Sequence, residues 1–156
     1  MGCTATCAYI ENDTLAIAHV GDSRAYLLHE GTLIRVTRDH SYVEELVDAG
    51  EITADEARVH PNRSVITRAL GSDPAMYADH FTLHIEEGDR LILCSDGLSS
   101  MIPDSDIENI ATQSSTAQIC VDNLVDAALA AGGHDNVTVV VVDLVDDLSL
   151  IHISEP

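Results

Sequence analysis

Three aspartates sit where a strand-like segment runs into a glycine-containing turn. Asp22 lies in a Gly-Asp-Ser-Arg sequence, Asp96 in Ser-Asp-Gly, and Asp135 in Gly-Gly-His-Asp-Asn. Strand ends are rigid, and the neighbouring glycines let the backbone turn sharply so that a second group can approach. Short carboxylates held in this way suit Mg²⁺ or Mn²⁺, because these hard ions take oxygen ligands in a demanding octahedral geometry. The three positions together indicate a divalent-metal centre.

A purely structural interpretation of the same aspartates stays open. Asp beside Gly is a common turn former that hydrogen-bonds its own backbone. With 27 acidic residues in the chain, several must fall near strand ends by chance. The loop histidines His40, His60 and His134 are equally ambiguous, because a histidine beside acids is more often a surface residue than a ligand. The four cysteines have neither zinc-site nor disulfide-framework spacing, so we interpret them as buried free thiols in a reducing cytoplasm.

The charge balance narrows the classes of partner. The 156 residues include 27 Asp and Glu against 7 basic residues, which gives a formal net charge of -20. Such a chain repels nucleic acid and anionic lipid and attracts divalent cations. No apolar run approaches the roughly 20 residues that a membrane span needs. We therefore expect one cytoplasmic domain with no nucleic-acid partner and no membrane segment here; the sequence indicates no particular oligomeric state.

Segments with strand-type sequence patterns and segments with helix-type patterns follow one another along the chain. Strand-type composition between turn residues predicts strands over 3–11, 14–20, 24–28, 33–36, 65–70, 77–85, 90–94 and 137–144, with clear alternation in 77–85 and little in 137–144. Helical spacing with capping residues predicts helices over 41–50, 53–58, 103–110 and 116–131. The first four strands are expected to form an antiparallel meander. The β-branched run 137–144 is typical of a central strand buried on both faces.

Six segments, in order, resemble the metal-dependent protein Ser/Thr phosphatases of the 2C type, and in particular their bacterial members. They are residues 1–5, 21–26, 37–41, 65–71, 88–98 and 132–138. The family usually has Thr where Cys3 stands. The resemblance covers residues 1 to about 144, and the helical insertion 41–62 is similar to the flap of the bacterial members. Any one of these segments is weak evidence for the resemblance, but six of them in the order found in the family are highly specific evidence.

The resemblance implies an α+β fold, a four-layer α-β-β-α sandwich of two antiparallel sheets flanked by helices. It also implies two or three Mn²⁺ or Mg²⁺ ions, with Asp96 and Asp135 as ligands of a two-metal centre and Asp22 as the ligand of a third, weaker site. Asp96 and Asp135 would act through a metal-activated water that hydrolyses phosphoserine and phosphothreonine. The implied partners are phosphorylated proteins, with a Ser/Thr kinase as one possible member.

The sequence departs from the family pattern at its start. The family's phosphate-binding Arg, an acidic pair and an Asp-Gly-x-Gly-Gly-His segment with a metal-bridging Asp are absent from it. We therefore expect residues 1–144 to be a partial catalytic domain, truncated at its N-terminus, inactive alone, and with sheet edges and apolar surface exposed. Residues 145–156 are expected to be a tail whose last residues are non-native.

Two other functions are compatible with parts of the sequence. A pseudophosphatase or protein-interaction module with the same fold would bind a partner without catalysis. The presence of Asp22, Asp96 and Asp135 argues against this alternative. A binding module has no need of metal ligands, and carboxylates placed close together repel one another. An acidic ion buffer is disfavoured because the chain has no EF-hand loop.

Overall fold

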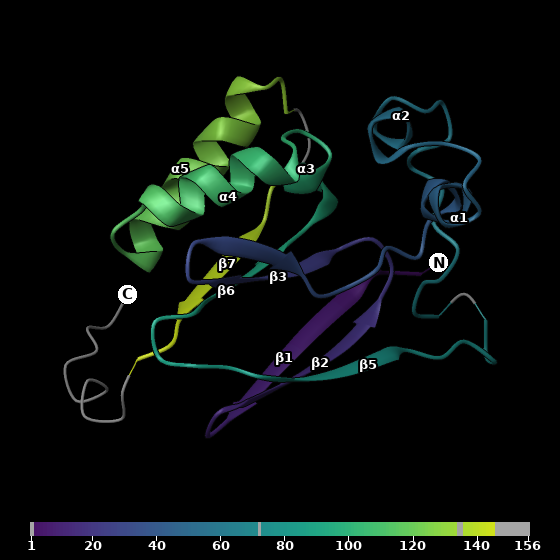
Figure 1. Ribbon diagram of the computed structural model, residues 1–156. Helices are drawn as coiled ribbons and strands as arrows, with labels where there is room; N and C mark the ends of the chain where they lie inside the picture. Colours follow the sequence, from purple (N-terminus) through teal and green to yellow (C-terminus); the bar gives the residue numbers. More distant parts are fainter. Residues whose placement is uncertain (1, 72, 134–135, 146–156) are drawn as a thin grey trace.

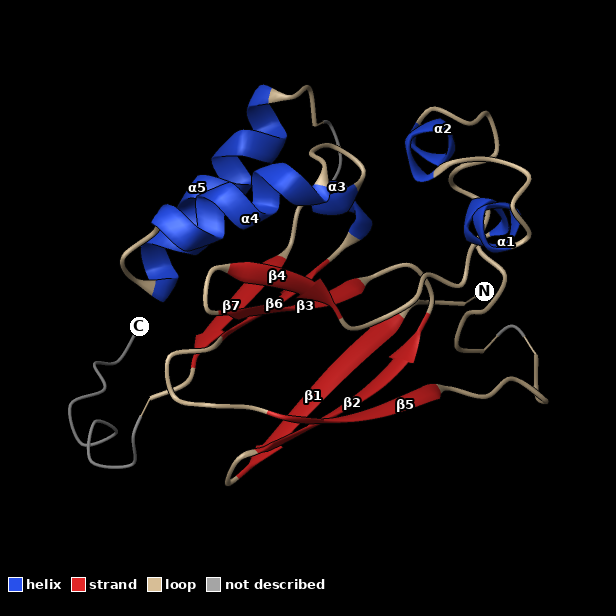
Figure 2. Cartoon of the chain, in the orientation of Figure 1, coloured by secondary structure: helices blue, strands red, loops and turns tan. Residues whose placement is uncertain are grey.

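The chain folds into two antiparallel sheets with helices packed on one of them (Figures 1 and 2). The computed structural model describes residues 2–71, 73–133 and 136–145. One sheet has the strand order β1-β2-β5 and the other β4-β3-β6-β7. The strands are β1 (Ala5–Glu11), β2 (Thr14–Val20), β3 (Arg24–His29), β4 (Thr32–Arg35), β5 (Asp79–His84), β6 (Arg90–Cys94) and β7 (Val139–Asp143). The helices are α1 (Tyr42–Asp48), α2 (Ala54–Arg58), α3 (Asp96–Ser99), α4 (Asp104–Gln113) and α5 (Ala117–Ala130).

The first four strands form two hairpins that belong to different sheets. Strand β1 pairs with β2 along its whole length, and β3 pairs with β4, but β2 pairs next with β5 and β3 with β6. The expected meander is therefore wrong. The chain changes sheet between β2 and β3, where Gly21 has a φ of 108° that favours glycine. Sequence patterns identify each strand but not its partner, because partner choice depends on distant residues.

Two apolar layers hold the sheets and helices together. The layer between the sheets contains Leu15, Ile17, Ala25, Leu27, Ile85 and Leu91. The layer between one sheet and the helices is built around Tyr26, Leu28, Ile92, Cys94, Leu98, Ile102, Ile107, Ala111, Cys120, Leu124 and Ala128. Strands β3 and β6 contribute to both layers, because successive side chains of a strand point to opposite faces. They are the central strands of their sheet.

Strand β7 lies at the edge of its sheet, so the expectation of a central strand over 137–144 is wrong. It pairs with β6 in the described chain, and the side chain of Val140 is 47% exposed. A run of β-branched residues indicates that a segment forms a strand with apolar side chains. It does not indicate how many strands pair with that segment, because this depends on the rest of the sheet. Strand β1 also exposes apolar side chains, among them Tyr9 at 65%.

Helices α4 and α5 cover the outer face of the β4-β3-β6-β7 sheet (Figure 2). In the part of the chain that the structure describes, no helix covers the outer face of the β1-β2-β5 sheet. The predicted class, α+β with two antiparallel sheets and flanking helices, is confirmed. Among the described residues, no helix is both long and apolar enough to cross a membrane.

Helices α1 and α2 lie to one side of the sheets (Figure 1) and fall within the segment predicted as an insertion. Their caps are as expected: the side chain of Ser41 accepts from the Glu44 N–H, and Thr53 forms a capping box with Glu56. The strand expected over 65–70 is wrong. Among the described residues, this segment makes only isolated bridges, from Ile66 to Ser41 and from Leu70 to Cys3.

Candidate metal centre

Asp22 is placed by the turn that leaves β2. A Cβ atom on the preceding Gly21 would lie 2.3 Å from Thr4 Cγ2, so a side chain there has no room. The positive φ of Gly21 disfavours any other residue for an independent reason. This tight turn holds the half-buried Asp22 at the end of the β1-β2-β5 sheet.

Asp96 is the first residue of α3 and is separated from the central strand β6 by one residue. The residue before it, Ser95, does not cap the helix with its side chain. Its hydroxyl instead accepts from the Thr138 N–H over 3.1 Å, and its own N–H donates to the Thr138 carbonyl over 3.0 Å. Asp96 is therefore fixed between a buried strand and the start of β7. The short helix α3 was not predicted, because four residues carry no periodicity.

Asp22 and Asp96 lie at the same end of the sandwich, because Asp22 precedes Arg24 of β3 by two residues, Asp96 follows Cys94 of β6 by two, and Arg24 pairs with Cys94. Burial, and then the neighbouring carboxylates of Asp96 and Asp39, raise the pKa of Asp22 to about 6. These neighbouring carboxylates disfavour the negative charge of Asp22, and a bound divalent cation would relieve that repulsion. Both groups offer the hard oxygen atoms that Mg²⁺ and Mn²⁺ prefer, so the residues fit such an ion. No group of three or more potential ligands occurs among the described residues.

The third predicted ligand, Asp135, lies outside the described residues, as does His134. The residue that follows them is described: a Cβ atom on Gly97 would lie 2.3 Å from the carbonyl oxygen of Asn136. The Ser-Asp-Gly segment therefore abuts the backbone next to Asp135. The role of Asp135 as a metal ligand stays a prediction.

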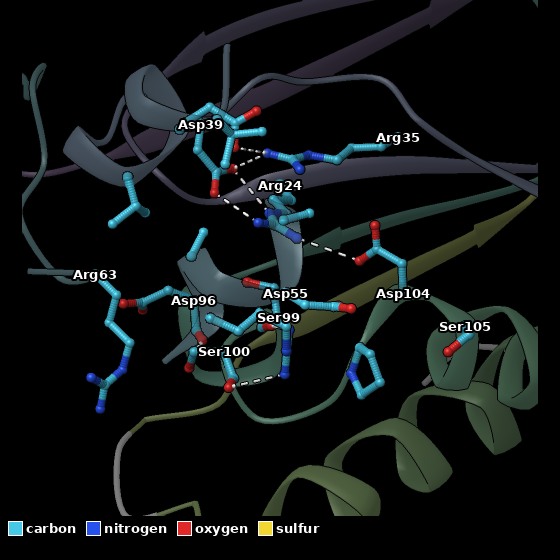
Figure 3. A pocket seen from close by; sticks show the side chains of 17 residues that line it. Arg24, Arg35, Asp39, Asp55, Arg63, Asp96, Ser99, Ser100, Asp104 and Ser105 are labelled. Atoms are coloured by element: carbon cyan, nitrogen blue, oxygen red, sulfur yellow. Dashed lines mark hydrogen bonds and ion pairs between the residues drawn. The ribbon is translucent and has the colours of Figure 1, made fainter. Parts of the chain in front are cut away.

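A cavity of about 390 Å³ opens beside Asp96, between α1 and α2 on one wall and α3 and α4 on the other (Figure 3). Its lining combines four arginines that the sequence alone did not identify with five carboxylates: Arg24, Arg35, Arg58 and Arg63, and Asp39, Glu44, Asp55, Asp96 and Asp104. The cavity is thus mixed in charge although the chain as a whole is strongly acidic.

Arg24, one of the lining arginines, has the most extensive set of ion pairs and hydrogen bonds to other side chains among them. It makes a bidentate pair with Asp39, with Nε to Oδ1 at 2.9 Å and Nη2 to Oδ2 at 2.8 Å. Its Nη1 donates to the hydroxyl of Tyr26 and to Asp104, as Figure 3 shows for the carboxylate. The Asp39 side chain is 11% exposed. Such a pair fixes planar geometry as well as charge, and the Gly-Asp-Ser-Arg motif was the available signal.

Arg58 joins the two walls of the cavity. From the end of α2, its Nη1 donates to the Ser99 carbonyl over 2.9 Å and its Nη2 to the Ser100 carbonyl over 3.4 Å. These carbonyls lie at the end of α3, the helix that begins with Asp96. The small helical insertion is therefore attached to the element that carries a candidate ligand.

All four cysteines are free, as predicted, but only two are buried. Burial raises the pKa of the Cys94 thiol to about 12 and also raises that of Cys120. These thiols are therefore poor nucleophiles at neutral pH. Cys3 and Cys7 are exposed, contrary to expectation, because they lie on or beside the edge strand β1.

Comparison with known proteins gives consistent matches. A family profile described as protein phosphatase 2C matches residues 1–137. A serine/threonine phosphatase stp from Listeria welshimeri is 39% identical over 143 residues, which are 92% of this chain and 57% of that protein. The chain thus spans a little over half the length of this relative. Serine/threonine protein phosphatase PstP from Mycobacterium tuberculosis is 44% identical over 149 residues, 94% of this chain and 28% of that protein.

Solved structures agree with the sequence matches. The crystal structure of the Mycobacterium tuberculosis phosphatase PstP/Ppp superimposes with a TM-score of 0.88 at 42% identity, covering 94% of this chain and 61% of that one. A structure of the catalytic domain of PstP in complex with two manganese ions has a TM-score of 0.83 at 40% identity, covering 94% of this chain and 60% of that one.

Proposed function

The chain belongs to the protein phosphatase 2C family, and from this premise we propose that it forms most of the active site of a metal-dependent protein Ser/Thr phosphatase of the bacterial type. The observation that carries the proposal is the approach of Asp22 and Asp96 at one end of the sandwich. The manganese ions named for the PstP structure support the same choice of metal. Asp135, from the segment beside Gly97, would complete the ligand set.

The chain's own residues would hold two or three Mn²⁺ or Mg²⁺ ions: Asp96 and Asp135 at a two-metal centre and Asp22 at a third position. When bound, such ions lower the pKa of a coordinated water, orient a phosphate and neutralise its charge. Asp22 and Asp96 contribute fixed carboxylates on rigid strand ends. Arg24 keeps Asp39 paired, so that this third carboxylate stays in a defined position near Asp22.

The substrates that fit this chemistry are proteins carrying phosphoserine or phosphothreonine. The cavity between α1 and α2 on one side and α3 and α4 on the other is large enough to take side chains of such a substrate, and its lining offers both arginines and carboxylates to them. A Ser/Thr kinase is a candidate partner, and the cytoplasm the proposed location. A role as a pseudophosphatase remains the alternative outcome of the test below.

The test is Mn²⁺-dependent hydrolysis of a phosphothreonine peptide by the native protein that carries this chain. Asp96→Asn and Asp135→Asn should each reduce the rate by about 100-fold or more, because each removes a ligand. Asp122→Asn, on an exposed position of α5, is the matched control and should leave the rate unchanged. A folded native protein that binds Mn²⁺ but does not hydrolyse the peptide would instead identify a pseudophosphatase.

We further propose that the 156-residue chain has negligible activity by itself. Its sequence contains no Asp-Gly-x-Gly-Gly segment, which in the family supplies the bridging ligand. The same assay on the isolated chain checks this point, and robust turnover would contradict it.

A further inference from the structure

His40 holds the peptide groups of Gly21, the residue before Asp22. The Gly21 N–H donates to His40 Nδ1 over 2.9 Å, and the His40 N–H donates to the Gly21 carbonyl over 2.8 Å. Both backbone polar groups of Gly21 are therefore engaged by one residue. His40 is 2% exposed, so water does not compete for these bonds.

The hydrogen bonds define the tautomer of the His40 ring. An amide N–H can only donate, so Nδ1 presents its lone pair and the ring proton is on Nε2. Nε2 then donates to Asp79 Oδ2 over 2.7 Å, and Asp79 Oδ1 accepts from Arg68 Nη1 over 3.0 Å. Burial alone would raise the pKa of Asp79, but the bonds from His40 and Arg68 outweigh it and hold this pKa below its usual value. Asp79 is thus a charged acceptor that fixes the ring.

The backbone of His40 is equally constrained. Its carbonyl accepts from the Thr67 N–H over 2.8 Å, where the chain returns from the segment that contains α1 and α2. Both ring nitrogens and both backbone polar groups of His40 are therefore in hydrogen bonds. A residue held at four points is a rigid support for whatever it contacts.

We propose that His40 is a positioning residue for the metal centre, whose ring sets the Gly21 peptide so that the Asp22 carboxylate faces Asp96. The inference rests on the proposed function, because it takes Asp22 to be a metal ligand. Gly21 has no side chain with which to anchor its own turn, and Thr4 occupies the space where one would lie. The His40 ring supplies that anchor. Residues behind metal ligands commonly set affinity by orienting the ligands.

Two substitutions separate the two ring contacts. In His40→Asn the side-chain oxygen takes the place of Nδ1 and can still accept from Gly21. In His40→Gln the carboxamide reaches the place of Nε2 and Asp79 but leaves the Gly21 N–H without an acceptor. A merely structural role would be disturbed by both changes, whereas the positioning role separates them.

The readout is Mn²⁺ binding by the 156-residue chain, followed by the loss of the electron paramagnetic resonance signal of the free ion, with circular dichroism to check folding. We expect His40→Asn to bind within about threefold of the wild type and His40→Gln about 10-fold more weakly, with Asp22→Asn at least as weak. A folded His40→Gln chain that binds like the wild type, or equal weakening in both variants, would overturn the inference. Unchanged binding by Asp22→Asn would instead overturn the assignment of Asp22 as a ligand, and the inference with it.

If His40→Gln does not fold, the wild-type chain provides the test. On titration with diamagnetic Mg²⁺, the nuclear magnetic resonance signals of the Gly21 amide and of His40 Nδ1 should shift together with the Asp22 carboxyl signal. An Asp22 signal that shifts while the other two stay unchanged would overturn the inference.

Discussion

The backbones of Gly97 and Asn136 are in such close contact that no side chain fits between them. A Cβ atom on Gly97 would lie 2.3 Å from the Asn136 carbonyl oxygen and 3.2 Å from Val137 Cα. This contact joins the start of α3, which carries Asp96, to the segment that follows Asp135. The geometry of the candidate metal centre therefore depends on a residue that has no side chain.

Gly97→Ala should disturb this contact. Because the obstructing atoms are backbone, either α3 or the 136–137 segment must move, at a cost of about 2 kcal/mol in the free energy of unfolding and with weaker Mn²⁺ binding. Urea denaturation and Mn²⁺ titration measure the two effects. Gly31→Ala is the control: its Cβ would meet open space, so only its positive φ opposes the change. It should cost about 1 kcal/mol and leave Mn²⁺ binding unchanged. Equal weakening of Mn²⁺ binding by the two variants would contradict a role for the Gly97 contact.

Arg24 and Asp39 should be energetically coupled. Arg24→Met leaves the largely buried Asp39 with one of its two arginine partners, Arg35, and should destabilise the fold by about 3 kcal/mol in urea denaturation. The double variant Arg24→Met/Asp39→Leu removes both charges of the pair and should be less destabilised than the sum of the single variants. Strict additivity would show that the pair contributes nothing beyond its separate residues.

Arg58 should hold α2 against α3. Arg58→Ala removes two hydrogen bonds to the end of α3, so amide hydrogen exchange in α2 should accelerate by about 10-fold while the exchange of the β6 amides stays unchanged. Arg63→Ala is the matched control, because Arg63 donates to the His60 carbonyl within its own segment. Faster exchange in the control variant as well would mean that charge, not the contact with α3, stabilises the helix.

His19 should make the fold sensitive to acid. Burial, and then the neighbouring His40, lower the pKa of His19 below its usual 6.5. The unfolded chain therefore takes up a proton in acid that the folded chain does not, so this contribution to stability is present above pH 6.5 and is lost as the pH falls below that value. Urea denaturation as a function of pH should show a shallower decline in His19→Gln than in the wild type. The exposed His80→Gln is the control and should follow the wild type.

The sequence by itself determined the local elements and the residues at their ends. Short-range patterns reveal features that depend only on neighbouring residues. These features are the caps of α1 and α2, most of the strands, and the aspartates at strand ends. The order of motifs also identified the family and the choice of divalent metal. Asp22 and Asp96 are therefore recognisable as candidate ligands from the sequence alone.

Only the tertiary structure decided which elements meet. Three features depend on pairing between distant segments. They are the separation of β2 and β3 into two sheets, the edge position of β7, and the lack of a strand over 65–70. Likewise, the contacts made by Arg24, His40 and Arg58 could not be predicted, because their partners are far away in the chain. The physical reason is that hydrogen bonds and packing between distant residues are selected by the whole fold, whereas caps, turns and strand propensity are properties of a few consecutive residues.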